Sequence, residues 1–198
     1  MAVPFILRPS PRFWENVQKR VSRNQDLPRN IFPHGPLIGS IGEIAFKEWF
    51  STTFPRRGIR HAGEVSHDYE IAGTGDDPAG ARRLTLEVKT KARTPAAITA
   101  KGTARWEMSV PGYLLHHLDE VKTHPDILFG VSVQTRSKQP AGIEDIDTIA
   151  ILGWIEFERF AKIKYLVPAD TPMGHGTTKN PVEMWNIAIG SLNDAGTL

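Results

Sequence analysis

The sequence predicts an α/β protein with a mixed central sheet flanked by helices. Two patterns indicate this fold class: apolar residues recur at helical spacing in two early segments, and short alternating or continuous apolar runs follow them. With 198 residues, 40% of them hydrophobic, the chain is long enough for one well-filled core and short for two. We therefore expect an N-terminal helix and loop extension (1–36), a core (37–164) and an irregular C-terminal tail (165–198).

Two helices are expected before the first strand. Ser10 and Pro11 are typical of a helix start, and the apolar spacing that follows predicts a helix over 11–23. Its polar face is basic, and we favour a solvated face over one that contacts phosphate: Arg12, Lys19, Arg20 and Arg23. A second apolar stripe predicts a helix over 37–50 that carries Glu43 at the edge of the stripe. In its first turn, Gly39 and Gly42 cost about 1 kcal/mol each relative to alanine unless close backbone approach is needed.

The strands are expected within six segments. These are 56–63, 67–71, 84–91, 106–110, 127–133 and 148–157. Gly153 predicts a bulge in the last of them. Turn-forming residues predict a hairpin loop over 72–81, and Pro111 opens a further helix that extends to Val121. In the tail, the apolar patch 184–189 is expected to dock on the protein's own core, with a partner subunit as the alternative.

Composition narrows the chemistry. The formal charge is +2, from 24 basic and 22 acidic residues, so any contact with nucleic acid must come from a local patch. The chain has no cysteine, which excludes disulfides, thiolate metal sites and cysteine nucleophiles. No apolar run approaches the ~18 residues that a membrane span needs. We expect a cytoplasmic protein with no membrane partner, whose metals bind oxygen or imidazole.

The most informative segment is 84–91, which contains Glu87, Val88 and Lys89. Side chains alternate along a strand, so Val88 faces the core while Glu87 and Lys89 share the other face. Asp68 lies on the strand before, and its carboxylate and that of Glu87 can bracket one Mg²⁺ or Mn²⁺, with the backbone carbonyl of Val88 as a third ligand. Glu43 can bind a second ion or hold a water, and Lys89 can orient the attacking water or stabilise the phosphate. Glu70 shares a face with Asp68 and is the alternative ligand.

Glu43, Asp68 and the Glu87-Val88-Lys89 triplet, on a helix followed by three strands, resemble the PD-(D/E)xK nuclease superfamily over about 37–133. His67 stands where the proline of the motif name would be. The resemblance implies a restriction-endonuclease-like αβββαβ core, with Asp68 and Glu87 as metal ligands, Lys89 as the catalytic lysine and Glu43 as the helix carboxylate. It implies a Mg²⁺-dependent or Mn²⁺-dependent nuclease that hydrolyses phosphodiester bonds, an endonuclease acting on DNA in preference to RNA.

A different class of protein is the alternative: a noncatalytic nucleic-acid binder or phage structural protein that keeps the nuclease fold. The small fold is compatible with a phage origin, and restriction-type or junction-resolving members of the superfamily would act as homodimers. Basic residues flank the Glu-x-Lys strand and predict a phosphate-binding rim, led by Lys91 and Arg93, although hairpin solubility explains them equally well. The rim comprises Arg82, Arg83, Lys91, Arg93, Lys101 and Arg105. Trp106 is expected in the core rather than stacked on a base.

A metal-independent ribonuclease would need a histidine, a lysine and a tyrosine that converge. His67, Lys89 and Tyr113 are the residues available for it. Nothing in their spacing favours this scheme over the carboxylate scheme.

Overall fold

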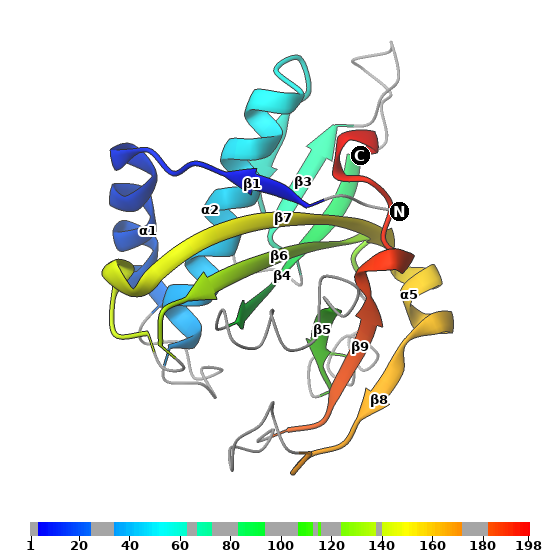
Figure 1. Cartoon of the computed structure of the whole chain (residues 1–198). Coiled ribbons are helices and arrows are strands. Elements are labelled where there is room, and N and C mark those ends of the chain that lie inside the picture. Colours follow the sequence, from blue (N-terminus) through cyan, green and yellow to red (C-terminus); the bar gives the residue numbers. More distant parts are fainter. Residues whose placement is uncertain are drawn as a thin grey trace.

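A six-stranded mixed sheet forms the centre of the molecule (Figure 1). The computed structural model describes residues 4–24, 34–62, 67–72, 83–93, 107–112, 115, 124–137, 140–171 and 182–198. The strand order is β1-β7-β6-β4-β3-β2, where only β4 and β6 pair in parallel. The strands are β1 (Phe5–Leu7), β2 (Ile59–His61), β3 (Tyr69–Ala72), β4 (Arg83–Arg93), β6 (Ile127–Thr135) and β7 (Ile146–Glu156). The predicted α/β class and mixed sheet are confirmed.

Two helices cover one face of this sheet, as the apolar spacing predicts. They are α1 (Pro11–Asn24) and α2 (Gly35–Thr53), which pack against each other (Figure 1). The second helix starts with a proline in its first turn, where a missing N–H breaks no helical hydrogen bond. Phe13 and Val17 of α1 are fully buried in the same core as α2, so the N-terminal segment is part of the core. The described part of the segment expected as an N-terminal extension (1–36) thus contributes to the core, and β1 also joins the central sheet.

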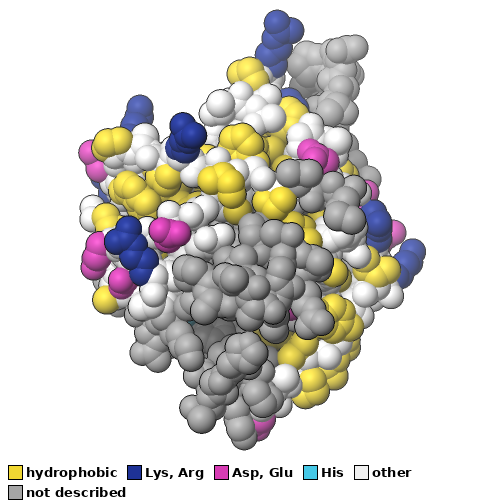
Figure 2. Space-filling view, viewed as in Figure 1, with side chains coloured by type: hydrophobic (Ala, Val, Ile, Leu, Met, Phe, Trp, Pro, Cys, Tyr) yellow, Lys and Arg dark blue, Asp and Glu magenta, His cyan; other side chains and the backbone are white. Residues whose placement is uncertain are grey.

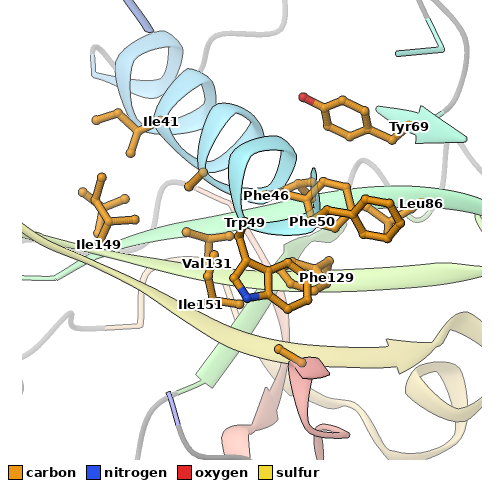
Figure 3. Close-up of a cluster of buried hydrophobic side chains, with 14 of the residues drawn as sticks. Ile41, Phe46, Trp49, Phe50, Tyr69, Leu86, Phe129, Val131, Ile149 and Ile151 are labelled. Atoms are coloured by element: carbon orange, nitrogen blue, oxygen red, sulfur yellow. The ribbon is translucent and has the colours of Figure 1, made fainter. Parts of the chain in front are cut away.

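Aromatic rings fill the space between α2 and the sheet (Figure 3). The ring of Phe46 lies 4.7 Å from that of Phe129 on β6 and 5.2 Å from that of Tyr69 on β3. Leu86 and Val88 of β4 belong to this same core, which we call the helix-side core. Alternation along β4 therefore places Glu87 and Lys89 on the opposite face of the sheet.

Gly42 allows α2 to lie directly against β4. A Cβ atom added at Gly42 would lie 2.8 Å from Cβ of Thr90, which is closer than real Cβ atoms approach, and 3.0 Å from its Cγ2. The same atom at Gly39 would meet nothing within 4 Å. Close backbone approach is thus the reason for the glycine at position 42, the residue beside Glu43, and it is not the reason at position 39.

A second, three-stranded sheet packs on the other face of the central sheet. Its strand order is β5 (Glu107–Pro111), β9 (Met184–Ala188) and β8 (Tyr165–Val167). The segment 106–110 was expected to form a strand, and it does so in this smaller sheet. The tail was expected to be irregular, which is wrong for β8 and β9, because β9 pairs along its whole length with β5. Ile187 is buried in a second core between the two sheets, together with Met108, Leu128 and Leu152. The patch 184–189 therefore docks on the protein itself, as predicted.

The remaining elements are short. They are the helix α5 (Phe157–Ile163) and the 3₁₀ turns η2 (Ile143–Asp145), η3 (Ile189–Ser191) and η4 (Ala195–Thr197). The bulge predicted in β7 is confirmed: Gly130 pairs with Gly153 and Val131 with Ile151, and Gly153 has a φ of 134°. Gly112 and Leu115 are helical, and the rest of the helix expected after Pro111 lies outside the described residues, as does the 73–81 loop.

The described surface carries a few large exposed apolar side chains. They are Phe5, Ile6, Ile163, Tyr165 and Leu166. In Figure 2, apolar side chains gather at the lower right, where Figure 1 places β8 and β9. No helix in the described part of the chain is both long and apolar enough to cross a bilayer.

Candidate functional site

The candidate site lies where the ladder between β3 and β4 ends. The two strands pair from Ala72 opposite Arg83 to Tyr69 opposite Leu86, and β4 then continues to Arg93 beyond the end of β3. Asp68 occupies the end of this ladder. Its backbone N–H donates to the carbonyl of Leu86, and its Oδ2 accepts from the N–H of Val88 at 2.7 Å. The carboxyl group therefore replaces the strand partner that Val88 has lost, which fixes its position against β4.

Glu87 and Lys89 form an ion pair on the face of β4 that points away from α2. Lys89 Nζ lies 2.6 Å from Glu87 Oε1, and the two side chains are 11% and 15% exposed. The Coulomb attraction within a pair this protected from water is stronger than at the surface, and removal of one partner leaves a poorly solvated charge. The lysine is therefore held beside the carboxylate that the sequence assigns to metal binding.

Glu43 reaches the site from α2. Its Oε2 accepts a hydrogen bond from Arg20 Nη2 of α1, and His61 Nε2 of β2 lies 3.9 Å from the same oxygen. The hydroxyl of Tyr69 donates to the backbone carbonyl of Glu43 at 3.0 Å, so β3 is bonded to the helix at this residue. Glu43 is 14% exposed, which confirms its predicted position at the edge of the apolar stripe.

The electrostatic environment shows that these groups act on one another. Burial raises the pKa of Asp68 well above its ordinary range, and the negative charges of Glu87 and Glu43 raise it further. Lys89 and the N–H of Val88 oppose this rise without cancelling it. The charges of Glu87, Glu43 and Lys89 therefore all act on the carboxyl group of Asp68. A carboxyl group in this state holds its proton more tightly than an exposed aspartate does.

The donor set suits a hard divalent cation. Carboxylate oxygens are the ligands that Mg²⁺ and Mn²⁺ prefer, and Asp68 is a buried acid whose proton affinity a cation would lower. As they stand, no three acidic or imidazole groups among the described residues are close enough to hold one ion. Each carboxylate has another partner: Arg20 for Glu43, the Val88 amide for Asp68, and Lys89 for Glu87. The carbonyl of Val88 stays a predicted ligand.

Glu70, the alternative ligand to Asp68, has different partners. Glu70 Oε2 lies 2.7 Å from Arg60 Nη2 and 3.4 Å from Arg83 Nη1. The hydrogen bond from Arg60 is the largest influence that lowers the pKa of Glu70, so this carboxyl is an ordinary ionised group. Arg83 was expected on the phosphate rim, and here it pairs with Glu70 instead.

Lys91 and Arg93 continue along β4 beneath the second sheet. Lys91 Nζ lies 2.7 Å from Ser109 Oγ and 3.7 Å from Glu107 Oε2, and Arg93 Nη2 donates to the carbonyl of Glu107 at 2.8 Å. Burial lowers the pKa of Arg93. The preferred phosphate contacts thus hold β5 against β4. Arg82, Lys101 and Arg105 lie outside the described residues, as does Trp106.

Two residues of the ribonuclease alternative lie in the described part of the chain, and each has a carboxylate partner. His67 Nε2 lies 3.9 Å from Glu70 Oε1, whereas Lys89 pairs with Glu87. Tyr113 lies outside the described residues.

Sequence reasoning overlooked two residues of the site, Arg20 and His61. Arg20 was assigned to a solvated face, although its spacing from Phe13 and Val17 places it on the buried side of α1. His61 gives no spacing signal. In comparisons with known proteins, no family model, curated protein or solved structure matches the chain. The assignments above therefore rest on the sequence and the structure alone.

Proposed function

We propose that the protein is a divalent-metal-dependent nuclease that hydrolyses phosphodiester bonds of DNA. One observation carries the proposal: Asp68 is buried at the end of the β3–β4 ladder and bonded to the N–H of Val88, where the charges of Glu87, Glu43 and Lys89 act on it. An acidic centre with an amine beside it has the components that metal-assisted phosphodiester hydrolysis uses. The PD-(D/E)xK resemblance of the sequence and the mixed sheet are consistent with this class of enzyme.

The residues have separate roles in the proposed mechanism. Asp68 and Glu87 would hold Mg²⁺ or Mn²⁺, which supplies charge neutralisation at the phosphate. Lys89 would then exchange its bond to Glu87 for one to the attacking water or to a phosphate oxygen, since its ammonium carries three donors. Burial and the neighbouring carboxylates favour the protonated form of Asp68, a bound cation would favour the charged form, and Lys89 lowers the penalty of that ionisation.

Cleavage assays on several substrates test the proposal. Supercoiled plasmid, linear duplex, branched DNA and single-stranded RNA are incubated with Mg²⁺, Mn²⁺ or EDTA. We expect metal-dependent cutting of DNA, and a fall of about 10²–10³-fold in Lys89→Ala, the size of effect seen when one preorganised donor is removed. Glu87→Ala and Asp68→Asn should also lose cleavage. Glu70→Gln is the matched control on the same strand face, and it should keep it.

Cutting that survives in EDTA, or in both Lys89→Ala and Glu87→Ala, would refute the proposal. The alternative function is nucleic-acid binding without turnover. It is favoured by the internal ion pairs, because Lys89 and Glu43 each already have an oppositely charged partner. Binding with no cutting in either metal would establish that alternative.

A further inference from the structure

Arg20 is a cation of the site that comes from outside the central sheet. It lies on α1, where Phe13, Val17 and Arg20 share the side of the helix that faces the core. Its side chain is 20% exposed, whereas Arg12, Lys19 and Arg23 of the same helix are exposed. The helix thus directs one of its basic residues toward Glu43 and the others toward solvent.

The guanidinium of Arg20 is only partly used. Both of its observed contacts, to Glu43 Oε2 and to His61 Nε2, involve the single nitrogen Nη2. Its Nε is buried and has no hydrogen-bond partner in the described part of the chain. A guanidinium has five N–H donors in a planar fork that matches a phosphate or carboxylate through two parallel bonds. Arg20 therefore has donors left for a second anion.

The place of Arg20 also suits an anion that enters the site. Arg20, Glu43 and Asp68 all act electrostatically on the hydroxyl of Tyr69, so the guanidinium lies within range of the acidic centre. Among the described contacts, Lys89 is the other cation near the carboxylates of Glu43, Asp68 and Glu87. Without Arg20, the negative charge of these three groups would exceed the positive charge beside them. Arg20 thus balances a charge that a divalent cation would also balance.

We propose that Arg20 is a phosphate-binding residue that Glu43 holds in reserve until a divalent cation occupies the acidic centre. This inference rests on the proposed function. A cation shared with Glu43 weakens the hold of that carboxylate on Arg20, because the same negative charge then serves two positive partners. The freed guanidinium binds a phosphate of the nucleic acid through its fork. The basic helix α1 is then part of the substrate-binding surface.

The proposal predicts a metal-dependent change in the salt dependence of binding. The logarithm of the binding constant falls linearly with the logarithm of the salt concentration, and each phosphate that a protein neutralises makes this slope steeper by about one unit. Binding of labelled duplex DNA is measured by anisotropy over a series of salt concentrations, in EDTA and in Ca²⁺, which takes the same oxygen ligands as Mg²⁺. Arg20→Ala should make the slope shallower by about one unit in Ca²⁺ and leave it unchanged in EDTA. Arg20→Lys should restore the slope, because lysine still neutralises a phosphate as a point charge.

Direct metal titration supplies the second readout. Calorimetry with Mn²⁺ and no nucleic acid should show affinity about tenfold higher in Arg20→Ala, because a positive charge that competes for Glu43 is gone. Arg23→Ala, one turn further along the same helix, is the matched control and should change neither the metal affinity nor the metal dependence of the slope. Thermal unfolding of each variant shows whether α1 still packs.

The outcomes separate the two proposals. An unchanged slope in Arg20→Ala, or an equal decrease with and without metal, would overturn the reserve role of Arg20. So would weaker Mn²⁺ binding, because it would make Arg20 a support for Glu43. A protein that binds no Mn²⁺ and cuts nothing would instead refute the proposed function itself.

Discussion

Replacement of Gly42 by alanine tests whether the contact between α2 and β4 positions the candidate site. The new Cβ would lie 2.8 Å from Thr90 Cβ, an atom directly attached to the strand backbone, so rotation of a side chain cannot relieve the overlap. Either α2 or β4 must shift. Overpacking of this kind destabilises a protein by about 1–3 kcal/mol.

Gly39→Ala is the control that isolates the destabilisation caused by the overlap with Thr90. Both positions lie in α2, and alanine stabilises a helix interior by about 1 kcal/mol relative to glycine at either of them. At Gly39 the added methyl group meets nothing within 4 Å, so we expect a gain in the free energy of unfolding. The difference between the two variants is then the overlap itself, about 1–3 kcal/mol.

Urea denaturation of the two variants gives this difference directly. The double variant Gly42→Ala/Thr90→Ala should recover part of the loss, because it removes Cγ2 and Oγ1 of Thr90, and a double-mutant cycle measures the coupling. We also expect weaker metal binding in Gly42→Ala, since Glu43 moves with the helix. Equal stabilisation by Gly42→Ala and Gly39→Ala would refute the view that the glycine at position 42 sets the distance between helix and strand.

Two further predictions concern the acidic centre and the C-terminus. Because the pKa of Asp68 is raised by burial and by its acidic neighbours, its contribution to stability is greatest below the ordinary pKa of an aspartate and falls as the pH rises toward the folded value. Asp68→Asn should therefore gain stability over the native protein as the pH rises above about 4 in metal-free buffer, and a gap that does not change with pH would contradict this. Arg57 donates to the carbonyl of Ala72 at 3.0 and 2.7 Å and to that of Leu198 at 2.6 Å. Arg57→Ala should lower the free energy of unfolding by about 2–3 kcal/mol, with Arg56→Ala, an exposed neighbour, within about 0.5 kcal/mol of native.

The sequence predicted those elements whose apolar pattern is long or strictly periodic. The helix around Glu43 and the strand of 84–91 were found because their buried faces repeat at the spacing of a helix or strand. The strand of 127–133 was found because it is a near-continuous apolar run. The strand β1 was missed because it has three residues, two of them exposed, and exists through pairing with β7. The strands β8 and β9 were missed for a similar reason, since β8 is short and β9 is defined by its contact with β5.

The positions of side chains in the candidate site were predictable where local geometry decides them, and not where a distant element does. Alternation along one strand sufficed to place Glu87 and Lys89 together. The fate of Lys91 and Arg93 depended on a second sheet whose strands come from three separate parts of the sequence. The partner of Glu43 likewise comes from a helix 23 residues earlier in the chain. The pattern of basic residues along α1 does not by itself distinguish a helix face that is wholly solvated from one in which a single residue, Arg20, points toward the core.

The packing and the proposed chemistry meet at adjacent residues of α2. Gly42 lets the helix touch β4, and Glu43 then lies close enough to raise the pKa of Asp68. Burial of Asp68 beside two other carboxylates disfavours its charged form, and Lys89 and the amide of Val88 partly offset this. Arg20 and Lys89 also neutralise Glu43 and Glu87. The charged form of Asp68 is thus disfavoured at the end of the β3–β4 ladder. A carboxyl group perturbed in this way is the strongest physical reason to look for function at this point of the fold.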